Sequence, residues 1–508
     1  MMEASETWNR LLAHVRETAL LESTAAMLEW DEHTGMPVQA AEYRAEQLML
    51  LSGMIHQRRT DPKIGEWLKA LADSSLASEP NSPIGASIRC MRRDYDKHVR
   101  LPESLVKQIA KATSLGQQAW VLARKENAFQ SFRPHLEEIL SLRRQEADLL
   151  VDEGMTRYDA LLDQYEEGAR ISTLSDLFSR LRDALVPLIH EASLPKNQPH
   201  SSCLAGLFDL DQQRSLSRWV AEQIGFDFSR GRLDETEHPF CTTLGPHDHR
   251  ILTRYHSDSF SSGLFGVLHE AGHGMYEQGL PAEWYGTPAA AAASLGVHES
   301  QSRLWENHVG LSREFWQWCL PHAQERFTNL QQVTVPQMVK ELNRVEPSLI
   351  RIEADEVTYN LHILIRFELE VDLINGSLSV ADLPEEWNRK YQDYLGIMPT
   401  SDAVGVLQDV HWSAGLIGYF PTYTLGNMYA AMLFDAAERD IPDLKARIQI
   451  GSFLPLLEWL RDRIHVYGRR YAPMALIEKA TGHSVTSQPL IDHLDRKVRS
   501  RSGASERS

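Results

Sequence analysis

The chain has 508 residues and a formal net charge of −18 at pH 7, with 43% hydrophobic and 24% charged residues. This composition is typical of a globular protein, and the length supplies enough apolar side chains for a large core. Because so acidic a chain is repelled by a phosphate backbone, the charge excludes a general nucleic-acid-binding protein.

The sequence predicts a cytoplasmic protein that does not bind membranes. Its first residues, MMEASETWNRLLAHVRE, lack the basic and apolar regions of a signal peptide. No uninterrupted apolar run is long enough to span a bilayer. The four cysteines are far apart and form no C-x-x-C pair. Such a pattern is typical of free thiols in a reducing compartment.

Helical patterns cover most of the chain. Residues 41–57 are rich in Leu, Ala, Glu and Arg, and residues 132–151 place apolar side chains at helical spacing. The best strand candidate is 249–260, which contains β-branched and aromatic residues. We therefore expect an all-α fold with a very small β component, as a single domain over 1–495. The basic, polar tail 496–508 is predicted to be disordered.

Immediately after the predicted strand lies FGVLHEAGHGMYEQG, in which His269, Glu270 and His273 form H-E-x-x-H. On a helix the two histidines share one face and can bind one ion, while the glutamate can reach a water beside that ion. Gly272 and Gly274 are poor helix formers, so their presence predicts the close approach of another backbone or a substrate. This pattern favours a hydrolytic metal site over structural histidines.

A third ligand is expected downstream, in SLGVHESQSRLWEN. Glu299 lies 26 residues after His273, and the neighbouring His298 is the rival candidate; spacing favours the glutamate and leaves both open. His247 and His249 also resemble a metal pair, but two histidines two apart in a loop are more typical of a surface.

Arg351 is predicted near the start of a long helix within 347–370. A cation there opposes the helix dipole, and it is tolerated if the guanidinium binds a carboxylate bidentately. That carboxylate is either a substrate's terminus or a nearby acid of the chain.

The segment 405–427 is aromatic, rich in glycine and almost uncharged, and it carries His411, Tyr419 and Tyr423. Such a stretch is either core or the wall of a cleft whose polar side chains donate to an oxyanion. The sequence alone leaves these two interpretations equal.

Seven short motifs together resemble the carboxypeptidase Taq family of metallocarboxypeptidases, and they follow the order found in that family. They are WDEHTGMP at 30–37, HPF at 238–240, DHRI at 248–251, HEAGH at 269–273, HESQ at 298–301, IRIEA at 350–354 and GVLQDVHW at 405–412. The resemblance implies an elongated helical body with a deep central groove, like that of neurolysin and angiotensin-converting enzyme. It also implies a cytosolic homodimer.

The resemblance further implies a broad-specificity carboxypeptidase that releases single residues from the free C-terminus of peptides. One zinc ion, or cobalt, would be bound by His269, His273 and Glu299, with Glu270 as the general base. We expect His411 and Tyr423 to donate to the oxyanion. Arg351 is the first candidate for binding the terminal carboxylate; the secondary candidates for substrate binding are Arg250, Tyr419 and His238.

Two alternatives are an oligopeptidase that cuts inside short peptides and a helical scaffold without catalysis. The family pattern D-x-R-x-T also places threonine at 252, where this chain has Leu252 followed by Thr253. We expect this departure to affect specificity or gating but not the metal chemistry.

Overall fold

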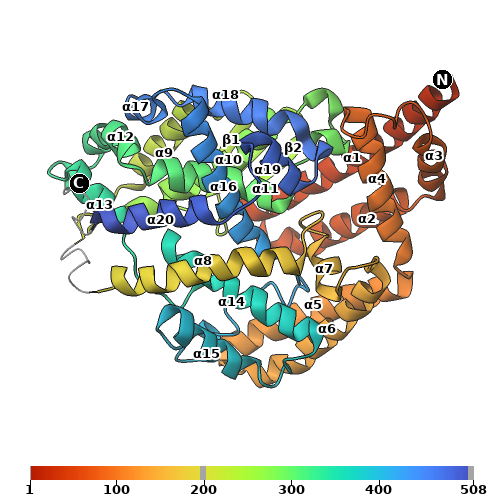
Figure 1. Ribbon diagram of the computed structural model, residues 1–508, viewed down its shortest axis with the longest axis horizontal. Helices are drawn as coiled ribbons and strands as arrows, with labels where there is room; N and C mark the ends of the chain where they lie inside the picture. Colours follow the sequence, from red (N-terminus) through yellow and green to blue (C-terminus); the bar gives the residue numbers. More distant parts are fainter. Residues whose placement is uncertain (1, 195–201, 502–508) are drawn as a thin grey trace. The chain divides into compact units, whose positions relative to one another are not determined.

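The computed structural model describes residues 2–194 and 202–501, which form two compact units (Figure 1). Unit 1 comprises residues 1–99, 202–342 and 433–484; unit 2 comprises 100–201, 343–432 and 485–508. Helices predominate, and the described strands form one small sheet. The mainly helical fold class is thereby confirmed, while the single domain over 1–495 stays a prediction.

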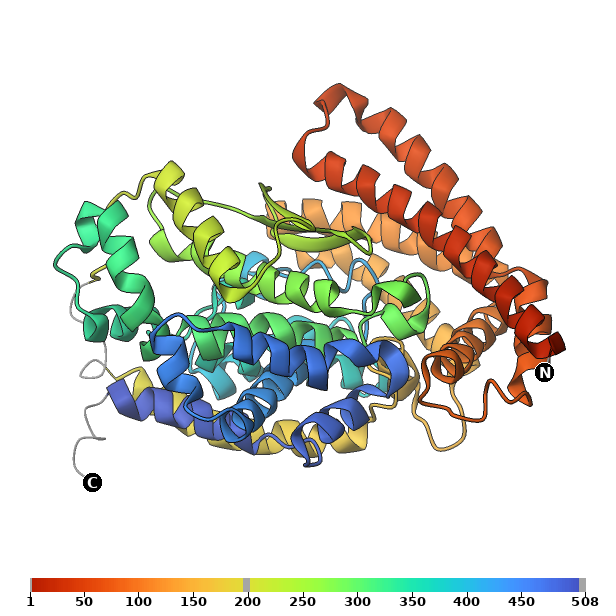
Figure 2. The same cartoon turned by 90° about the horizontal axis from the view of Figure 1, so that it is seen from above.

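Unit 1 combines its sheet with helices from all three of its segments. Its helices are α1 (Met2–Thr34), α2 (Ala41–Arg59), α3 (Pro62–Ala72), most of α4 (Pro83–Arg100), α9 (Leu210–Ile224), α10 (Phe260–Gly279), α11 (Leu295–Arg303), α12 (Arg313–Arg326), α13 (Val335–Leu342), α17 (Leu444–Gln449), α18 (Leu454–Arg463) and α19 (Pro473–Thr481). Figure 2 shows α1 and α2, drawn in red and orange, as an extended helical hairpin.

The sheet of unit 1 has the strand order β1-β3-β2 (Gly231–Glu235, Asp248–Thr253 and Phe240–Gly245). β3 pairs in parallel with β1 and antiparallel with β2. It overlaps the predicted strand 249–260 but begins one residue earlier and ends at Thr253, and the helix α10 begins at Phe260. The side chain of Ser259 caps α10 by accepting a hydrogen bond from the backbone of Ser262. α10 therefore begins soon after β3 and packs against the sheet.

Two glycines permit close packing on α10, as the sequence predicts: Gly272 against backbone and Gly274 against side chains. A Cβ added at Gly272 would stand 2.6 Å from the carbonyl oxygen of Gln301 and 2.6 Å from Cα of Ser302. A Cβ at Gly274 would stand 2.6 Å from the ring of Phe226, which packs beside β3. The first glycine therefore sets the approach of α11 to α10.

Unit 2 is built around α14 (Glu356–Asn375), in which 15 of the 20 residues are buried. Helices α7 (Arg157–Leu162), α8 (Ile171–Ala192) and α15 (Leu383–Leu395) pack against it, as Figure 1 also shows. The unit also contains α5 (Glu103–Glu126), α6 (Phe129–Leu150), α20 (Gln488–Arg501) and residues 421–432 of α16 (Pro421–Asp440), whose last eight residues belong to unit 1.

The helices expected over 41–57 and 132–151 correspond to α2 and α6. The tail predicted to be disordered begins at 496, but α20 continues to Arg501, and residues 502–508 lie outside the described residues. Over residues 2–194 and 202–501, each helix is too short or too polar to cross a membrane.

Replacing Gly272 by alanine tests the close approach of α10 and α11. The new Cβ would meet backbone and not a flexible side chain, so the overlap is expected to cost about 3 kcal/mol. The better helix propensity of alanine offsets about 1 kcal/mol of this. We expect a net loss of about 2 kcal/mol and a lower midpoint of thermal unfolding.

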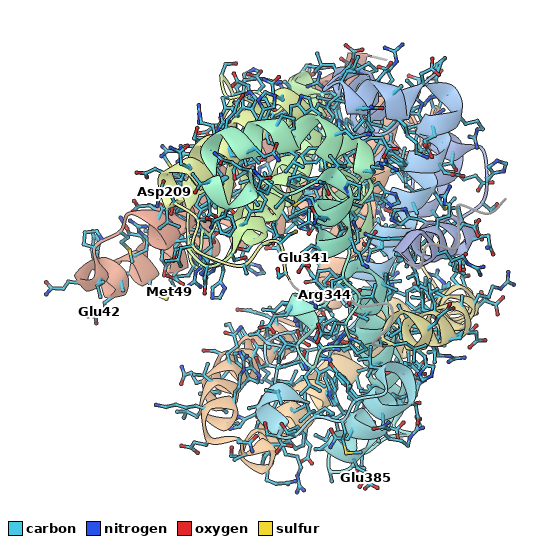
Figure 3. The ribbon with its side chains drawn as sticks, turned by 90° about the vertical axis from the view of Figure 1, so that its left-hand side faces the viewer. Glu42, Met49, Asp209, Glu341, Arg344 and Glu385 are labelled. Carbon is cyan, nitrogen blue, oxygen red and sulfur yellow. The ribbon has the colours of Figure 1, made fainter. Side chains whose placement is uncertain are left out.

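Gly53 of α2 supplies the matched control. Every residue of α2 is described and none is buried; Glu42 and Met49 lie on its outer surface (Figure 3). A Cβ at Gly53 meets nothing within 4 Å in the described chain, so Gly53→Ala should gain up to about 1 kcal/mol. An unfolding midpoint of Gly272→Ala as high as that of Gly53→Ala would contradict the packing.

Candidate active site

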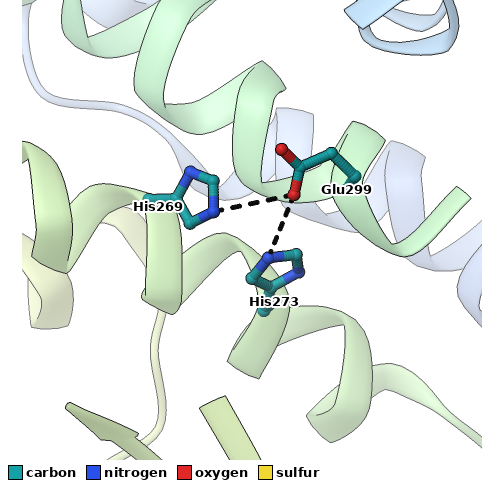
Figure 4. Close-up of side chains that lie close together, drawn as sticks. All are labelled: His269, His273 and Glu299. Carbon is teal, nitrogen blue, oxygen red and sulfur yellow. Dashed lines mark ion pairs between the residues drawn. The ribbon is translucent and has the colours of Figure 1, made fainter. Parts of the chain in front are cut away.

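The two histidines of H-E-x-x-H lie one turn apart on α10, and Glu299 reaches them from α11 (Figure 4). Oε2 of Glu299 lies 3.6 Å from Nε2 of His269 and 3.5 Å from Nε2 of His273. Ligand atoms about 2.0–2.1 Å from a tetrahedral ion are roughly 3.3–3.4 Å apart. The three side chains therefore fit a small divalent cation.

Two further charged side chains, Arg303 and Glu306, contact the candidate ligands and form a second layer of charge around them. Glu306 accepts a hydrogen bond from Nδ1 of His269 at 2.8 Å, and Arg303 ion-pairs with both Glu299 (2.7 Å) and Glu306 (3.1 Å). A carboxylate on the far nitrogen of a ligand histidine orients the ring. Sequence analysis missed this layer, although Glu299, Arg303 and Glu306 follow the i, i+4, i+7 spacing of one helical face.

Glu299 and His273 have the ionisation states that suit a cation, whereas His269 must lose a proton when a cation binds. Burial opposes ionisation of Glu299, but Arg303 and His269 hold its pKa well below the usual value. Burial lowers the pKa of His273 to about 3, which keeps that imidazole neutral. Burial would also lower the pKa of His269, but Glu299 and Glu306 raise it to about 9. An anionic glutamate and a neutral histidine are the forms that bind metals.

Glu270 follows the first histidine on α10 and is only 6% exposed. Burial raises its pKa to about 7, with His269 opposing the shift and Glu299 adding to it. A carboxyl group that titrates near neutral pH is well suited to accept and return a proton during catalysis.

The other histidines have structural contacts. His298 stacks on His273 with ring centroids 4.3 Å apart, and its Nε2 lies 3.0 Å from Oε1 of Glu277. It therefore lies beside the candidate ligands and is not one of them. The expectation of a surface pair holds for exposed His247 but is wrong for His249, which is 2% exposed because β3 carries it into the sheet.

Arg250 is held by its own strand and by α1. It pairs bidentately with Asp248 at 2.9 Å for both bonds, and its guanidinium lies 4.2 Å from the ring centroid of Trp30. The WDEHTGMP motif therefore supplies a cation–π contact to the DHRI motif. His238, the other candidate from unit 1, is exposed between β1 and β2.

The departure at Leu252 places an apolar side chain in β3. Leu252 is fully buried, and so is the adjacent Thr253, whose hydroxyl donates to the carbonyl of Gly263 at 3.3 Å. Successive side chains of a strand point to opposite faces. Thr253 therefore contacts α10 and cannot replace a hydroxyl at position 252.

In unit 2, Arg351 lies in a short 3₁₀ turn (Arg351–Glu353) and not in a long helix, because α14 begins only at Glu356. The expected conflict with the helix dipole is therefore absent among these described residues. Its Nη2 lies 2.8 Å from Oδ1 of Asp409, and its Nη1 donates to the hydroxyl of Tyr359 at 2.9 Å. The structure therefore contains an ion pair with an acid of the chain, but this acid lies 58 positions away and is not one of the local acids that the sequence suggested.

Asp409 joins Arg351 to a second buried arginine. Arg366, which is 0% exposed, donates from Nε to Oδ2 of Asp409 at 2.6 Å. Burial opposes ionisation of Asp409, but the two arginines hold its pKa well below the usual value. Arg366 was not identified from the sequence, because nothing in its helical pattern links it to a residue 43 positions away.

His411, Tyr419 and Tyr423 also cluster in unit 2. Nε2 of His411 lies 3.1 Å from the hydroxyl of Tyr423, and the ring of Tyr419 is 5.4 Å from each of the other two rings. Burial lowers the pKa of His411 to about 4, so the ring is neutral at pH 7. The candidates from segment 405–427 thus form one polar and aromatic group, in which His411 is buried and the two tyrosines are half-buried.

A buried H-E-x-x-H helix with a carboxylate from a second helix defines a metallopeptidase of the helical zincin type. The family model of the carboxypeptidase Taq (M32) metallopeptidases matches residues 10–498. Thermostable carboxypeptidase 1 of Thermus thermophilus is 44% identical over 504 residues, covering 98% of this chain and 99% of the relative. The chain therefore belongs to the carboxypeptidase Taq (M32) family, and it is a metal-dependent carboxypeptidase acting on peptides.

Solved structures agree with this assignment. The crystal structure of M32 carboxypeptidase from Deinococcus radiodurans R1 is 40% identical, with a TM-score of 0.94, 98% of this chain covered and 100% of that one. Metallocarboxypeptidase 1 of Trypanosoma cruzi is 33% identical, with a TM-score of 0.93, and the comparison covers 97% and 99% of the two chains. These structures share the mainly helical fold of the present chain.

Glu306→Gln tests the second layer of charge. The amide removes the negative charge beside His269 and the ion pair with Arg303, so affinity for the divalent metal should fall about 10- to 100-fold. Competition with a chelator of known affinity measures this without any assay of activity. Glu325→Gln, at a side chain that is 70% exposed, is the control. Equal metal affinity in both variants would show that Glu306 does not support the site.

Proposed function

We propose that His269, His273 and Glu299 hold one zinc ion, with cobalt as the alternative, and that Glu270 is the general base. Such a cation, when bound, polarises the scissile carbonyl and lowers the pKa of water. Glu270 accepts the proton of the attacking water and passes it to the leaving amine. The observation that carries the proposal is the set of three ligand atoms gathered beside a buried carboxyl of raised pKa.

Tyr423 and His411 are proposed to stabilise the oxyanion of the tetrahedral state. If neutral His411 carries its proton on Nε2, it donates to the oxygen of Tyr423, and the tyrosine can direct its own proton at the oxyanion. His411 thereby orients the donor.

Recognition of the free C-terminus is assigned to Arg351. Asp409 and Tyr359 hold its guanidinium in one orientation, which leaves less conformational entropy to lose when it binds a carboxylate. Arg250, Tyr419 and His238 remain secondary candidates. Like Arg351, which pairs with Asp409, Arg250 is already paired with an acid of the chain, Asp248.

A homodimer in the cytoplasm, with broad specificity for the terminal residue, completes the proposal. Support for the dimer comes from large apolar side chains that α1 and α2 expose, which a second copy could cover. These are Leu20, Met27, Tyr43, Met49, Leu50 and Met54. The wide spacing of the four cysteines supports a reducing compartment.

Glu270→Gln tests the general base. The amide keeps the shape of the side chain but cannot accept the proton, so kcat should fall about 10²- to 10⁴-fold. Metal content, measured by elemental analysis of the purified variant, should stay at the wild-type stoichiometry. Full turnover in the metal-loaded variant would remove Glu270 from the mechanism.

Arg351→Ala tests recognition of the terminal carboxylate. Loss of a charge-assisted hydrogen bond of about 1.5–3 kcal/mol should raise KM for a peptide with a free C-terminus about 10- to 100-fold. The wild type should also discriminate against the C-terminally amidated twin, and the variant should not. Arg250→Ala is measured in parallel: a larger rise in KM there would transfer the role to Arg250.

A further inference from the structure

Residues 405–420 carry His411 and Tyr419 and lead directly into the first turn of α16, which carries Tyr423. All sixteen are described, and they form turns and bends without regular secondary structure. Turn hydrogen bonds within the segment, such as Leu416 N–H to the carbonyl of His411 at 2.9 Å, fix its local shape, but its place in the fold requires contacts to other elements. The position of His411 therefore depends on contacts from neighbouring elements.

One buried carboxylate supplies three of these contacts. Glu370 of α14 is 0% exposed. It accepts from the indole Nε1 of Trp412 at 2.9 Å, from the backbone N–H of Gly418 at 3.0 Å and from the hydroxyl of Tyr158 at 2.7 Å. Two of the donors, Trp412 and Gly418, belong to the segment, so Glu370 links two points just inside the ends of the loop from His411 to Tyr419.

A neighbouring residue of α14 holds the segment at a third point. Arg366, one turn before Glu370, donates to Asp409 at 2.6 Å. Residues four apart lie on one face of a helix. This face of α14 therefore contacts positions 409, 412 and 418, which surround His411 in the sequence.

The chemistry at Glu370 requires an acceptor. The indole N–H of Trp412 and the backbone N–H of Gly418 can donate but never accept. Only a side chain whose two terminal atoms both carry lone pairs can accept from these two groups and from the hydroxyl of Tyr158. Burial raises the pKa of Glu370 to about 7, while the three donors and Arg366 oppose that rise. Glutamine has one acceptor oxygen, and its amide nitrogen would face a donor; a buried donor without a partner is unfavourable.

We propose that Glu370 is a positioning residue for the carboxypeptidase reaction, because it holds the loop that places His411 and Tyr423. This inference rests on the proposed oxyanion role of those two residues. Glu370 touches neither substrate nor metal ligands in the proposed mechanism. It acts through the geometry of the loop, where a displacement of about 1 Å is enough to lower a rate 10²-fold.

Glu370→Gln is the direct test. We expect kcat on a free-C-terminus peptide to fall about 10- to 100-fold, with KM within about twofold of the wild type and metal affinity unchanged. A purely structural defect would lower the amount of folded enzyme without this separation of kcat from KM.

Glu368→Gln is the matched control on the same helix. Glu368 also accepts from three side chains, but these come from α8 and α15: Arg182, Lys390 and Tyr394. We expect this variant to lower the unfolding midpoint and to keep the wild-type kcat. An equal fall of kcat in both glutamine variants would mean general destabilisation and would overturn the proposal.

The double variant Glu370→Gln/His411→Ala separates this inference from the proposed function. If Glu370 acts through His411, adding Glu370→Gln to the His411→Ala variant should lower kcat little further. If Glu370→Gln lowers kcat by the same factor in the wild type and in the His411→Ala variant, only the positioning role is overturned. The same holds if Glu370→Gln keeps the wild-type kcat while His411→Ala lowers it. Unchanged kcat in His411→Ala would overturn both proposals.

If Glu370→Gln does not fold, Tyr158→Phe decides. It deletes one donor to Glu370 while leaving the loop's own residues intact. A kcat reduced several-fold at unchanged KM would support the proposal, and a wild-type kcat would overturn it.

Discussion

The candidate active site depends on the backbone contact between α10 and α11 at Gly272. Even a methyl group at this position would stand 2.6 Å from the backbone of Gln301 and Ser302. Because the helices touch there, Glu299, two residues before Gln301, comes within 3.5–3.6 Å of both histidines of α10. The glycine costs helix propensity, and the close contact it permits assembles the three ligand atoms.

Buried charges then hold each group of side chains in place. In unit 1, Arg303 lies between Glu299 and Glu306; in unit 2, Asp409 lies between Arg351 and Arg366. Removing one partner of such a cluster leaves an uncompensated buried charge, which is strongly unfavourable. The same electrostatics that keep these carboxylates ionised also restrict the guanidinium of Arg351 to one orientation.

Sequence analysis predicted the features that local spacing encodes. Period 3.6 placed His269 and His273 on one face, and the two glycines correctly predicted a close approach to α10. Contacts between distant segments were missed, because side-chain periodicity says nothing about which surfaces meet. The missed contacts include the cation–π contact of Arg250 with Trp30, the ion pair of Arg366 with Asp409 and the three hydrogen bonds to Glu370. His249 was placed on the surface although it begins the predicted strand 249–260, because the strand pattern does not show which of its side chains other elements cover.

The central claim is that one divalent cation binds where α10 and α11 converge. Anomalous diffraction from zinc-loaded crystals, recorded on both sides of the zinc absorption edge, tests it most directly. One strong peak per chain is expected, within about 2.0–2.2 Å of Nε2 of His269, Nε2 of His273 and a carboxylate oxygen of Glu299. A strong peak elsewhere, with none at these three atoms, would contradict it.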